Sequence, residues 1–169
     1  LGLYFCTQNK MLESGILREH SNICFMIIFI SGSINSGKST IAKLLSEKII
    51  NSALIEVDSL CEFIDWMPIE QAVPINLQNA VSVIKNFSQH KIHAIVPYPL
   101  SQKNYDFMLS QLGEMKENIF TFILNSKLEK VLSNRGAREL TDWEKERIEH
   151  HYKIGINNPG FGIVIDNTN

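Results

Sequence analysis

A glycine-rich motif at residues 32–39, GSINSGKS, constrains the fold of this chain more than any other feature. It matches the pattern GxxxxGK(S/T) at every fixed position. The apolar run at residues 26–30 precedes it and predicts a buried strand. Apolar residues at helical spacing within residues 41–49 follow it and predict an amphipathic helix. Because the pattern stands between a strand and a helix, it predicts a loop that binds phosphate groups.

The residue types in this loop explain how it would hold a nucleotide. Gly32 and Gly37 permit backbone conformations that turn successive N–H groups inward, and neither carries a Cβ that would block a phosphate. The N-terminus of the following helix adds unpaired N–H groups and a positive dipole. Lys38 can reach the terminal phosphates, and the Ser39 hydroxyl can ligate Mg²⁺. We therefore expect ATP and Mg²⁺ to be bound by Gly32, Ser33, Ile34, Asn35, Ser36, Gly37, Lys38, Ser39 and Thr40.

Beyond the motif, short apolar runs alternate with helical patterns, which is typical of a parallel sheet wrapped by helices. Thr141 and Glu144 match a capping box, so a helix is expected to begin there and to run to about Gly155. This order predicts an α/β fold, a three-layer α/β/α sandwich of the P-loop NTPase type with a five-stranded parallel sheet. Its strands are expected at residues 26–30, 53–57, 92–96, 119–124 and 163–165.

A chain of 169 residues has room for one domain with one core. We expect that domain to span residues 26–169. Residues 1–25 show no clear periodicity and are expected to form an N-terminal extension of uncertain order. Because residues 166–169 alone follow the last predicted strand, we expect the domain to lack the closing helix that would normally cover this edge.

Composition narrows the class of partner. The formal net charge of -2 argues against a general nucleic-acid binder, because that role requires a basic surface that displaces counterions. The longest apolar stretch, residues 23–30, is too short to cross a bilayer as a helix. Cys6, Cys24 and Cys61 are odd in number and lack CxxC spacing, which favours neither a disulfide framework nor a zinc site. A reduced, cytoplasmic setting away from membranes fits best.

Asp58 is the first candidate for chemistry outside the loop. It closes the predicted strand at residues 53–57, and side chains at the carboxyl ends of parallel strands face the ligand crevice. A carboxylate there can accept the proton of an attacking hydroxyl. Aspartate is also a favoured N-cap, so Asp58 could instead cap a helix that begins at Ser59. The two roles can coexist.

Two arginines, Arg135 and Arg138, flank Gly136 between two predicted helices. Such a segment suits a mobile lid over the phosphates, where guanidinium groups neutralise charge on a transferred group. The alternative is a solvated helix end, at which Gly136 caps the helix and Arg135 meets its dipole. Arg138 lies beyond that helix and is the stronger catalytic candidate.

Other classes of protein with this loop fit less well. The chain contains no NKxD, and no DxxG follows the third predicted strand, as a GTP-hydrolysing switch would require. A motor ATPase would carry an acidic residue after a hydrophobic strand, whereas the third strand here ends in Pro97, Tyr98 and Pro99. A carboxylate after the second strand and arginines on a lid instead indicate phosphoryl transfer to a small molecule.

Residues 32–39, 57–60 and 135–138 together resemble the chloramphenicol phosphotransferase-like group of P-loop kinases, which lies near the adenylylsulfate, shikimate and gluconate kinases. The resemblance extends over roughly residues 26–169, and the phosphate loop is its most specific part.

This resemblance implies an ATP- and Mg²⁺-dependent kinase that moves the γ-phosphoryl group to a hydroxyl of a small molecule. It further implies that Asp58 is the acceptor-side base and that Arg135 and Arg138 belong to the lid. The segment from Pro97 to Pro99 replaces the more usual acidic or small residues, so chloramphenicol itself is not implied as the acceptor.

The rival hypothesis is a regulatory or partner-binding nucleotide module without phosphotransfer. The missing acidic residue after the third strand favours this rival, because Mg²⁺ would be held less well. Asp58 and the two lid arginines favour the kinase, since binding alone needs neither. The sequence indicates neither the acceptor nor the oligomeric state.

Several other residues fit structural roles. Metal binding is not expected at His150 and His151, which have no neighbouring cysteine and no histidine partner at helical spacing. Trp66 and Tyr98 fit either stacking on an acceptor ring or simple packing. A solvated helix face is predicted for charges that alternate in sign, namely Lys145, Glu146, Arg147 and Glu149.

Overall fold

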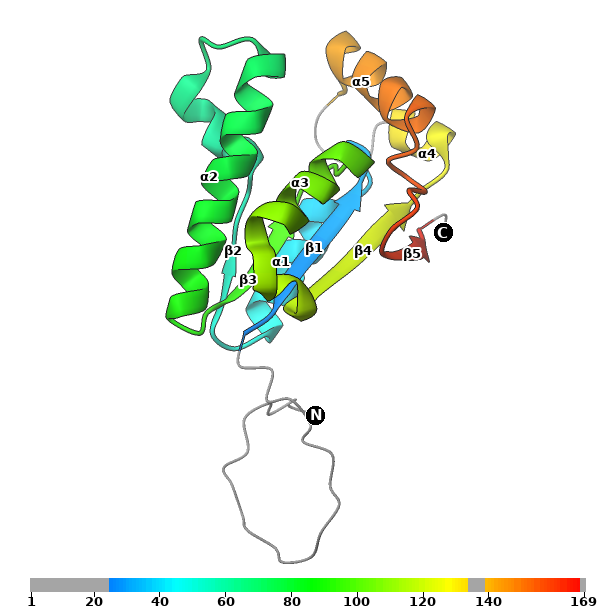
Figure 1. Cartoon of the computed structure of the whole chain (residues 1–169). Coiled ribbons are helices and arrows are strands. Elements are labelled where there is room, and N and C mark those ends of the chain that lie inside the picture. Colours follow the sequence, from blue (N-terminus) through cyan, green and yellow to red (C-terminus); the bar gives the residue numbers. More distant parts are fainter. Residues whose placement is uncertain (1–24, 134–138, 168–169) are drawn as a thin grey trace, which may run out of the picture.

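Residues 25–133 and 139–167, the part of the chain that the computed structural model describes, form a parallel sheet with helices on both faces (Figure 1). The sheet has five strands in the order β2-β3-β1-β4-β5, and every neighbouring pair is parallel. The predicted α/β class and five-stranded parallel sheet are therefore confirmed. The first strand lies at the centre of the sheet, so the phosphate loop emerges from the middle of its carboxyl edge.

Strands and helices alternate along the described chain. The strands are β1 (Ile27–Gly32), β2 (Ser52–Leu54), β3 (His93–Pro97), β4 (Ile119–Asn125) and β5 (Ile163–Asp166). The α-helices are α1 (Lys38–Lys48), α2 (Ile69–Gln89), α3 (Gln102–Leu112), α4 (Leu128–Leu132) and α5 (Asp142–Lys153). Two 3₁₀ helices are η1 (Asp58–Ile64) and η2 (Gly113–Asn118).

The central strand is apolar on both of its faces because both are covered by helices. Ile27 and Phe29 are buried on the face that α2 and α3 cover. Ile28 and Ile30 belong to a second cluster, which includes Ala42 of α1. Successive side chains of a strand point to opposite faces, so an uninterrupted apolar run is what a doubly covered strand requires. This packing fixes the strand from which the phosphate loop begins.

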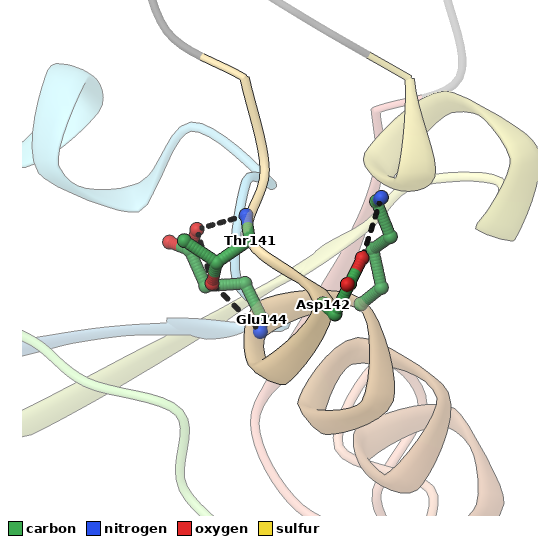
Figure 2. Close-up of polar contacts among 4 residues, drawn as sticks. Thr141, Asp142 and Glu144 are labelled. Carbon is green, nitrogen blue, oxygen red and sulfur yellow. Dashed lines mark hydrogen bonds and ion pairs between the residues drawn. The ribbon is translucent and has the colours of Figure 1, made fainter.

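The start of α5 follows the predicted capping box (Figure 2). The Thr141 hydroxyl accepts a hydrogen bond from the Glu144 N–H at 3.2 Å, and a Glu144 carboxylate oxygen accepts one from the Thr141 N–H at 2.9 Å. Two N–H groups that the helix cannot pair internally are thereby satisfied. The capping box confirms the predicted start of the helix.

Helices α4 and α5 pack over the carboxyl edge of the sheet, at the end where the phosphate loop lies (Figure 1). Val131 of α4 and Ile148 of α5 are buried together with Leu140, which precedes α5. Ile34 of the phosphate loop packs against this cluster. The last helix is therefore attached to the loop itself.

The second strand is shorter than predicted. β2 ends at Leu54, although the Ile55 N–H still bonds to the Ile95 carbonyl at 2.8 Å. The chain then turns, because the Ser59 N–H bonds back to the Glu56 carbonyl at 3.2 Å. Asp58 consequently begins η1 instead of closing a strand.

The strand β5 lies at an edge of the sheet and is exposed along its length. Ile163 is 62 % exposed, and Val164 and Ile165 are each about two-fifths exposed. The predicted absence of a closing helix remains a prediction, since residues 168–169 lie outside the described ranges.

The predicted N-terminal extension falls outside the described residues except for Phe25, which is buried in the core beside Ile27. Among the helices of the described ranges, none combines the length and the apolar character that crossing a membrane requires.

Candidate active site

The phosphate loop joins β1 to α1 through two glycines with positive φ. Gly32 has a φ of 141°, and a Cβ there would lie 2.8 Å from both the Leu124 carbonyl oxygen and Ser36 Oγ. Gly37 has a φ of 91° and precedes α1, where no side chain caps the helix. No atom lies within 4 Å of where a Gly37 Cβ would be. The loop thus presents the open, uncapped N-terminus of an 11-residue helix.

Two polar groups of the loop fit an anion. Ser36 Oγ is buried and has no hydrogen-bond partner among the described residues. The Lys38 ammonium is held within the loop, where it donates to the Ser33 carbonyl at 2.7 Å. Burial lowers the pKa of Lys38 to about 8, while the charges of Asp58 and Glu56 oppose this shift. A buried hydroxyl, an uncapped helix and an ammonium group together suit a phosphate.

Two carboxylates, Glu56 and Asp58, lie beside the loop. The Ser39 hydroxyl donates a hydrogen bond to Glu56. Burial raises the pKa of the Glu56 carboxyl, and the Asp58 charge raises it further, against the hydrogen bond from Ser39 and the charge of Lys38. Burial also raises the pKa of the Asp58 carboxyl, which Lys38 opposes. Hydroxyl and carboxylate oxygens are ligands that Mg²⁺ prefers, so Ser39 and the neighbouring Glu56 fit the predicted metal site.

The position of Asp58 tests the capping role that the sequence left open. Val57 occupies the N-cap position of η1, and the Leu60 N–H bonds to the Val57 carbonyl at 3.1 Å. Asp58 makes no hydrogen bond to any described residue and is exposed to the cavity beside the phosphate loop. The capping interpretation is therefore wrong, and the catalytic role of Asp58 stays a prediction.

Lys38, Ser39 and the two carboxylates line one cavity of about 570 Å³ at the carboxyl edge of the sheet. The phosphate loop, the segment after β2, the segment after β3 and α5 all contribute to its walls. Its chemically active lining residues include Lys38, Ser39, Glu56, Asp58, Tyr98 and Arg147. Tyr98 is 7 % exposed, and burial, with the nearby Asp58, raises the pKa of its hydroxyl so that it stays protonated.

Arg147 is the main correction to the predicted solvated face of the last helix. Its side chain is half-buried and lines the cavity, and its charge acts on Tyr98 and His151. Lys145 does behave as predicted, since it is half exposed and pairs with the exposed Asp142 at 3.1 Å (Figure 2). The alternating charges predicted a fully solvated face and gave no sign that Arg147 lines the cavity.

His151 lies four residues after Arg147 and is only 3 % exposed. Its Nδ1 is 3.2 Å from Ser33 Oγ in the phosphate loop. Burial, together with the charges of Arg147, Lys38 and His150, lowers the pKa of His151 to about 3, so the imidazole is neutral. The histidine joins α5 to the loop as a neutral hydrogen-bonding group. Among the described residues, no group of three or more His, Cys, Asp or Glu side chains suits a metal ion.

The neutral His151 predicts a specific loss of stability in acid. Its pKa in the folded state lies below the ordinary value of 6.5, so the unfolded chain binds the extra proton between these values. Stability is therefore full above about pH 6.5 and falls as the pH drops toward 3, by at most about 1.4 kcal/mol per pH unit from this residue. We expect His151→Gln to show a shallower fall than wild type in urea unfolding between about pH 7 and pH 5.

The matched control is His150→Gln, since His150 is the exposed neighbour on the same helix. It should retain most of the wild-type slope, because the His150 charge is the smallest of the influences that lower the pKa of His151. Equal slopes for wild type and His151→Gln would show that the buried imidazole does not set the acid stability.

Two asparagines tie the phosphate loop to distant segments. Asn35 donates through Nδ2 to the carbonyls of Val131 at 2.8 Å and Ser133 at 3.0 Å, at the end of α4. Asn167, after β5, donates through Nδ2 to the Ser36 carbonyl at 2.8 Å. The loop is therefore held from three directions, by α4, by α5 and by the segment that follows the last strand.

Two of the predicted catalytic residues are not placed. Arg135 and Arg138 lie outside the described residues, so their assignment to a lid stays a prediction. Trp66 is 75 % exposed and is not among the residues that line the cavity, whereas Tyr98 lines it. Glu56, Arg147 and His151 are the site residues that the sequence did not identify.

The chain shares its fold with solved kinase structures. A gluconokinase from Sinorhizobium meliloti 1021 matches with a TM-score of 0.64 and 11 % identity over 85 % of this chain and 83 % of its own. A sugar kinase from Janibacter sp. HTCC2649 matches with a TM-score of 0.63 and 17 % identity over 85 % of this chain and 86 % of its own. The shikimate kinase from Aquifex aeolicus vf5 matches with a TM-score of 0.50 and 23 % identity over 84 % of this chain and 86 % of its own.

These likenesses confirm the P-loop kinase fold and, at these identities, the fold alone. They do not confirm the narrower resemblance to the chloramphenicol phosphotransferase-like group. No protein-family model matches the chain, and no curated protein matches its sequence.

Proposed function

We propose that this protein is an ATP-dependent phosphotransferase that moves the γ-phosphoryl group of ATP to a hydroxyl of a small molecule. The observation that supports this proposal most is the meeting of Lys38, Ser39 and Asp58 in one cavity. The phosphate loop and the Asp58 carboxylate, which makes no hydrogen bond to the described part of the chain, both line it. The net charge of -2 favours a small-molecule acceptor over a nucleic acid.

Asp58 acts as the general base in this proposal. Its carboxylate accepts the proton of the acceptor hydroxyl while the hydroxyl oxygen bonds to the γ-phosphorus. The bond from that phosphorus to the oxygen bridging the β- and γ-phosphates breaks, and ADP leaves. The raised pKa of the Asp58 carboxyl brings it closer to neutral pH, which makes it a better proton acceptor.

Lys38 and the phosphate loop bind the triphosphate and neutralise charge on the transferred group. Arg135 and Arg138 are proposed to add further positive charge from a lid. Mg²⁺, when bound, would neutralise the β- and γ-phosphate oxygens, and Ser39 and Glu56 are the residues proposed to hold it. Glu56 thus supplies the acidic group that is missing after the third strand.

The metal assignment predicts a shift in the Mg²⁺ requirement. Ser39→Ala and Glu56→Gln should each raise the Mg²⁺ concentration at half-maximal activity by roughly 10–100-fold. The first removes the hydroxyl proposed to bind Mg²⁺, and the second replaces the neighbouring carboxylate by a neutral amide. Activity should recover at high Mg²⁺. The measurement is a Mg²⁺ titration of ATP consumption at fixed ATP.

Ser46→Ala is the matched control, because Ser46 lies on the same helix and its hydroxyl bonds to the Lys43 carbonyl at 2.8 Å, away from the cavity. Its titration should match that of wild type. A Ser39→Ala titration that overlays wild type would remove Ser39 from the metal site.

The direct test of the proposed function is an ATP-consumption screen over hydroxylated metabolites, nucleosides and antibiotics, run beside a Lys38→Ala protein. A kinase should consume ATP in proportion to a phosphorylated product that mass spectrometry detects. A regulatory nucleotide module should bind ATP–Mg²⁺ with no product from any acceptor, and the proposal would then be abandoned.

A further inference from the structure

The cation Arg147 lines the cavity and has no carboxylate partner within residues 25–133 and 139–167. It forms no ion pair or hydrogen bond with any residue of the described ranges, although it is half-buried. Lys38, the other cation lining the cavity, is held inside the phosphate loop through Ser33. A half-buried guanidinium without an anion is costly unless a ligand supplies one, so it points to an anionic group.

A second hollow continues from the cavity at this point. It has a volume of about 240 Å³ and lies between α2 and α3. Ile69, Val73, Asn104 and Arg147 line both hollows, so the two adjoin. We call the second hollow the α2–α3 groove.

The α2–α3 groove is mainly apolar. Its apolar lining residues are Ile69, Val73, Pro74 and Leu77 of α2 and Phe107 of α3. Its charged lining residues are Lys103, Arg147 and Glu70. The two cations against one carboxylate leave the groove with a positive balance, which complements an anion. A ligand that fills it would bury apolar surface next to a cation.

The charges of the main cavity give such a ligand one orientation. Glu56 and Asp58 lie at the end beside the phosphate loop, and they repel an acid group. Glu144 also lines the cavity, but its carboxylate accepts hydrogen bonds from the Thr141 N–H and hydroxyl at the start of α5. Arg147 lies where the cavity meets the groove. An acid group is therefore directed toward Arg147, which leaves a hydroxyl of the same molecule free to approach Asp58.

We infer that the acceptor is a hydroxylated molecule with both an acid group and an apolar portion. The acid group binds Arg147, the apolar portion lies in the α2–α3 groove, and the hydroxyl faces Asp58. This inference rests on the proposed phosphotransfer function and narrows its acceptor class. Carboxylates and phosphate esters satisfy the same guanidinium chemistry.

The experiment measures binding and turnover with probes that separate the two features. The probes are glycerate, hydroxyhexanoate and hydroxydecanoate, each paired with its neutral primary amide, and glycerol phosphate as the phosphate ester. Calorimetry in the presence of saturating ADP–Mg²⁺ gives affinities without requiring turnover. ATP consumption then gives kcat/KM for each probe.

We expect each acid to bind more tightly than its amide by roughly 10–100-fold, the effect of a charge-assisted hydrogen-bonded pair. Affinity should also rise from glycerate to hydroxydecanoate as the apolar portion grows. Arg147→Met should remove the preference for acids, and Arg147→Lys should restore part of it. Lys145→Met replaces an exposed cation on the same helix, and it should alter neither the preference for acids nor the rise in affinity with chain length.

A groove variant tests the apolar portion separately. Val73→Ser should weaken the dependence on chain length and keep the preference for acids. Equal binding of acids and amides, or an equal loss of both in Arg147→Met, overturns the inference. If amides are phosphorylated as well as acids, the proposed function stands and the inference fails, whereas failure of ADP–Mg²⁺ to bind overturns both.

Discussion

Replacing Asp58 by asparagine is expected to lower phosphotransfer by roughly 10²–10⁴-fold, the usual contribution of a general base. Asparagine has nearly the same size but cannot accept the acceptor proton. Because the Asp58 carboxylate makes no hydrogen bond to a described residue, its replacement should leave thermal stability close to wild type. ATP affinity should also change little, since Lys38 and the phosphate loop bind the donor. The measurement is single-turnover phosphotransfer beside thermal unfolding and calorimetry with ATP–Mg²⁺.

Asp65→Asn is the matched control. Asp65 follows η1, is exposed and does not line the cavity, so the same chemical change there should be silent in all three measurements. If Asp58→Asn turns over normally, the acceptor-side half of the mechanism has to be given up. A variant that melts earlier without losing turnover would show that the carboxylate supports structure instead.

Replacing Lys38 by alanine should weaken ATP–Mg²⁺ binding and lower turnover by about 10²–10³-fold, the effect of removing one preorganised donor from a charged transition state. Lys38 is the only cation that the cavity shares with the described part of the phosphate loop. Its pKa of about 8 leaves it protonated at neutral pH, so alanine removes a full charge. Calorimetry gives the loss of binding, and product formation gives the loss of turnover.

The variant also bears on stability, because a buried ammonium with a lowered pKa opposes folding. We therefore expect Lys38→Ala to be at least as stable as wild type, which separates lost function from lost fold. Lys43→Ala, an exposed position on the same helix, serves as the control. Wild-type ATP affinity in a folded Lys38→Ala protein would contradict the role assigned to this lysine.

The parts of the fold that the sequence predicted well are those whose signals are local. The strand–loop–helix unit around Gly32 and Lys38 is encoded by apolar runs and by glycines that fit positive φ. The start of α5 is encoded by Thr141 and Glu144, three residues apart. Such signals need no knowledge of what the segment packs against.

Glu56 was missed because its role depends on where a strand ends. A motor ATPase carries its acidic residue after the third strand, whereas here β2 stops at Leu54 and the chain turns to bring Glu56 to Ser39. The available signal was proximity in the sequence, since Glu56 stands only two residues before the candidate Asp58. The early end of the strand itself was not visible in the apolar run.

Arg147 and His151 were missed for a different reason. Each belongs to a stretch of charged or polar residues that is typical of a solvated helix face. Their positions relative to Glu144, three and seven residues on, place all three on one side of α5, and all three line the cavity. Helical spacing carried that information, but it could not say that this face of the helix meets the phosphate loop.

The contacts that hold the phosphate loop determine how late in synthesis of the chain the loop can be held in place. The hydrogen-bond partners of Asn35, Ser33 and Ser36 lie far along the chain. They follow these residues by 96, 118 and 131 positions, respectively. A growing polypeptide on the ribosome therefore carries the complete motif long before the loop is secured. Only after Asn167 has emerged are all three contacts available, so a nascent or prematurely terminated chain should retain nucleotide poorly. Stable nucleotide binding would then require synthesis of the chain at least as far as Asn167.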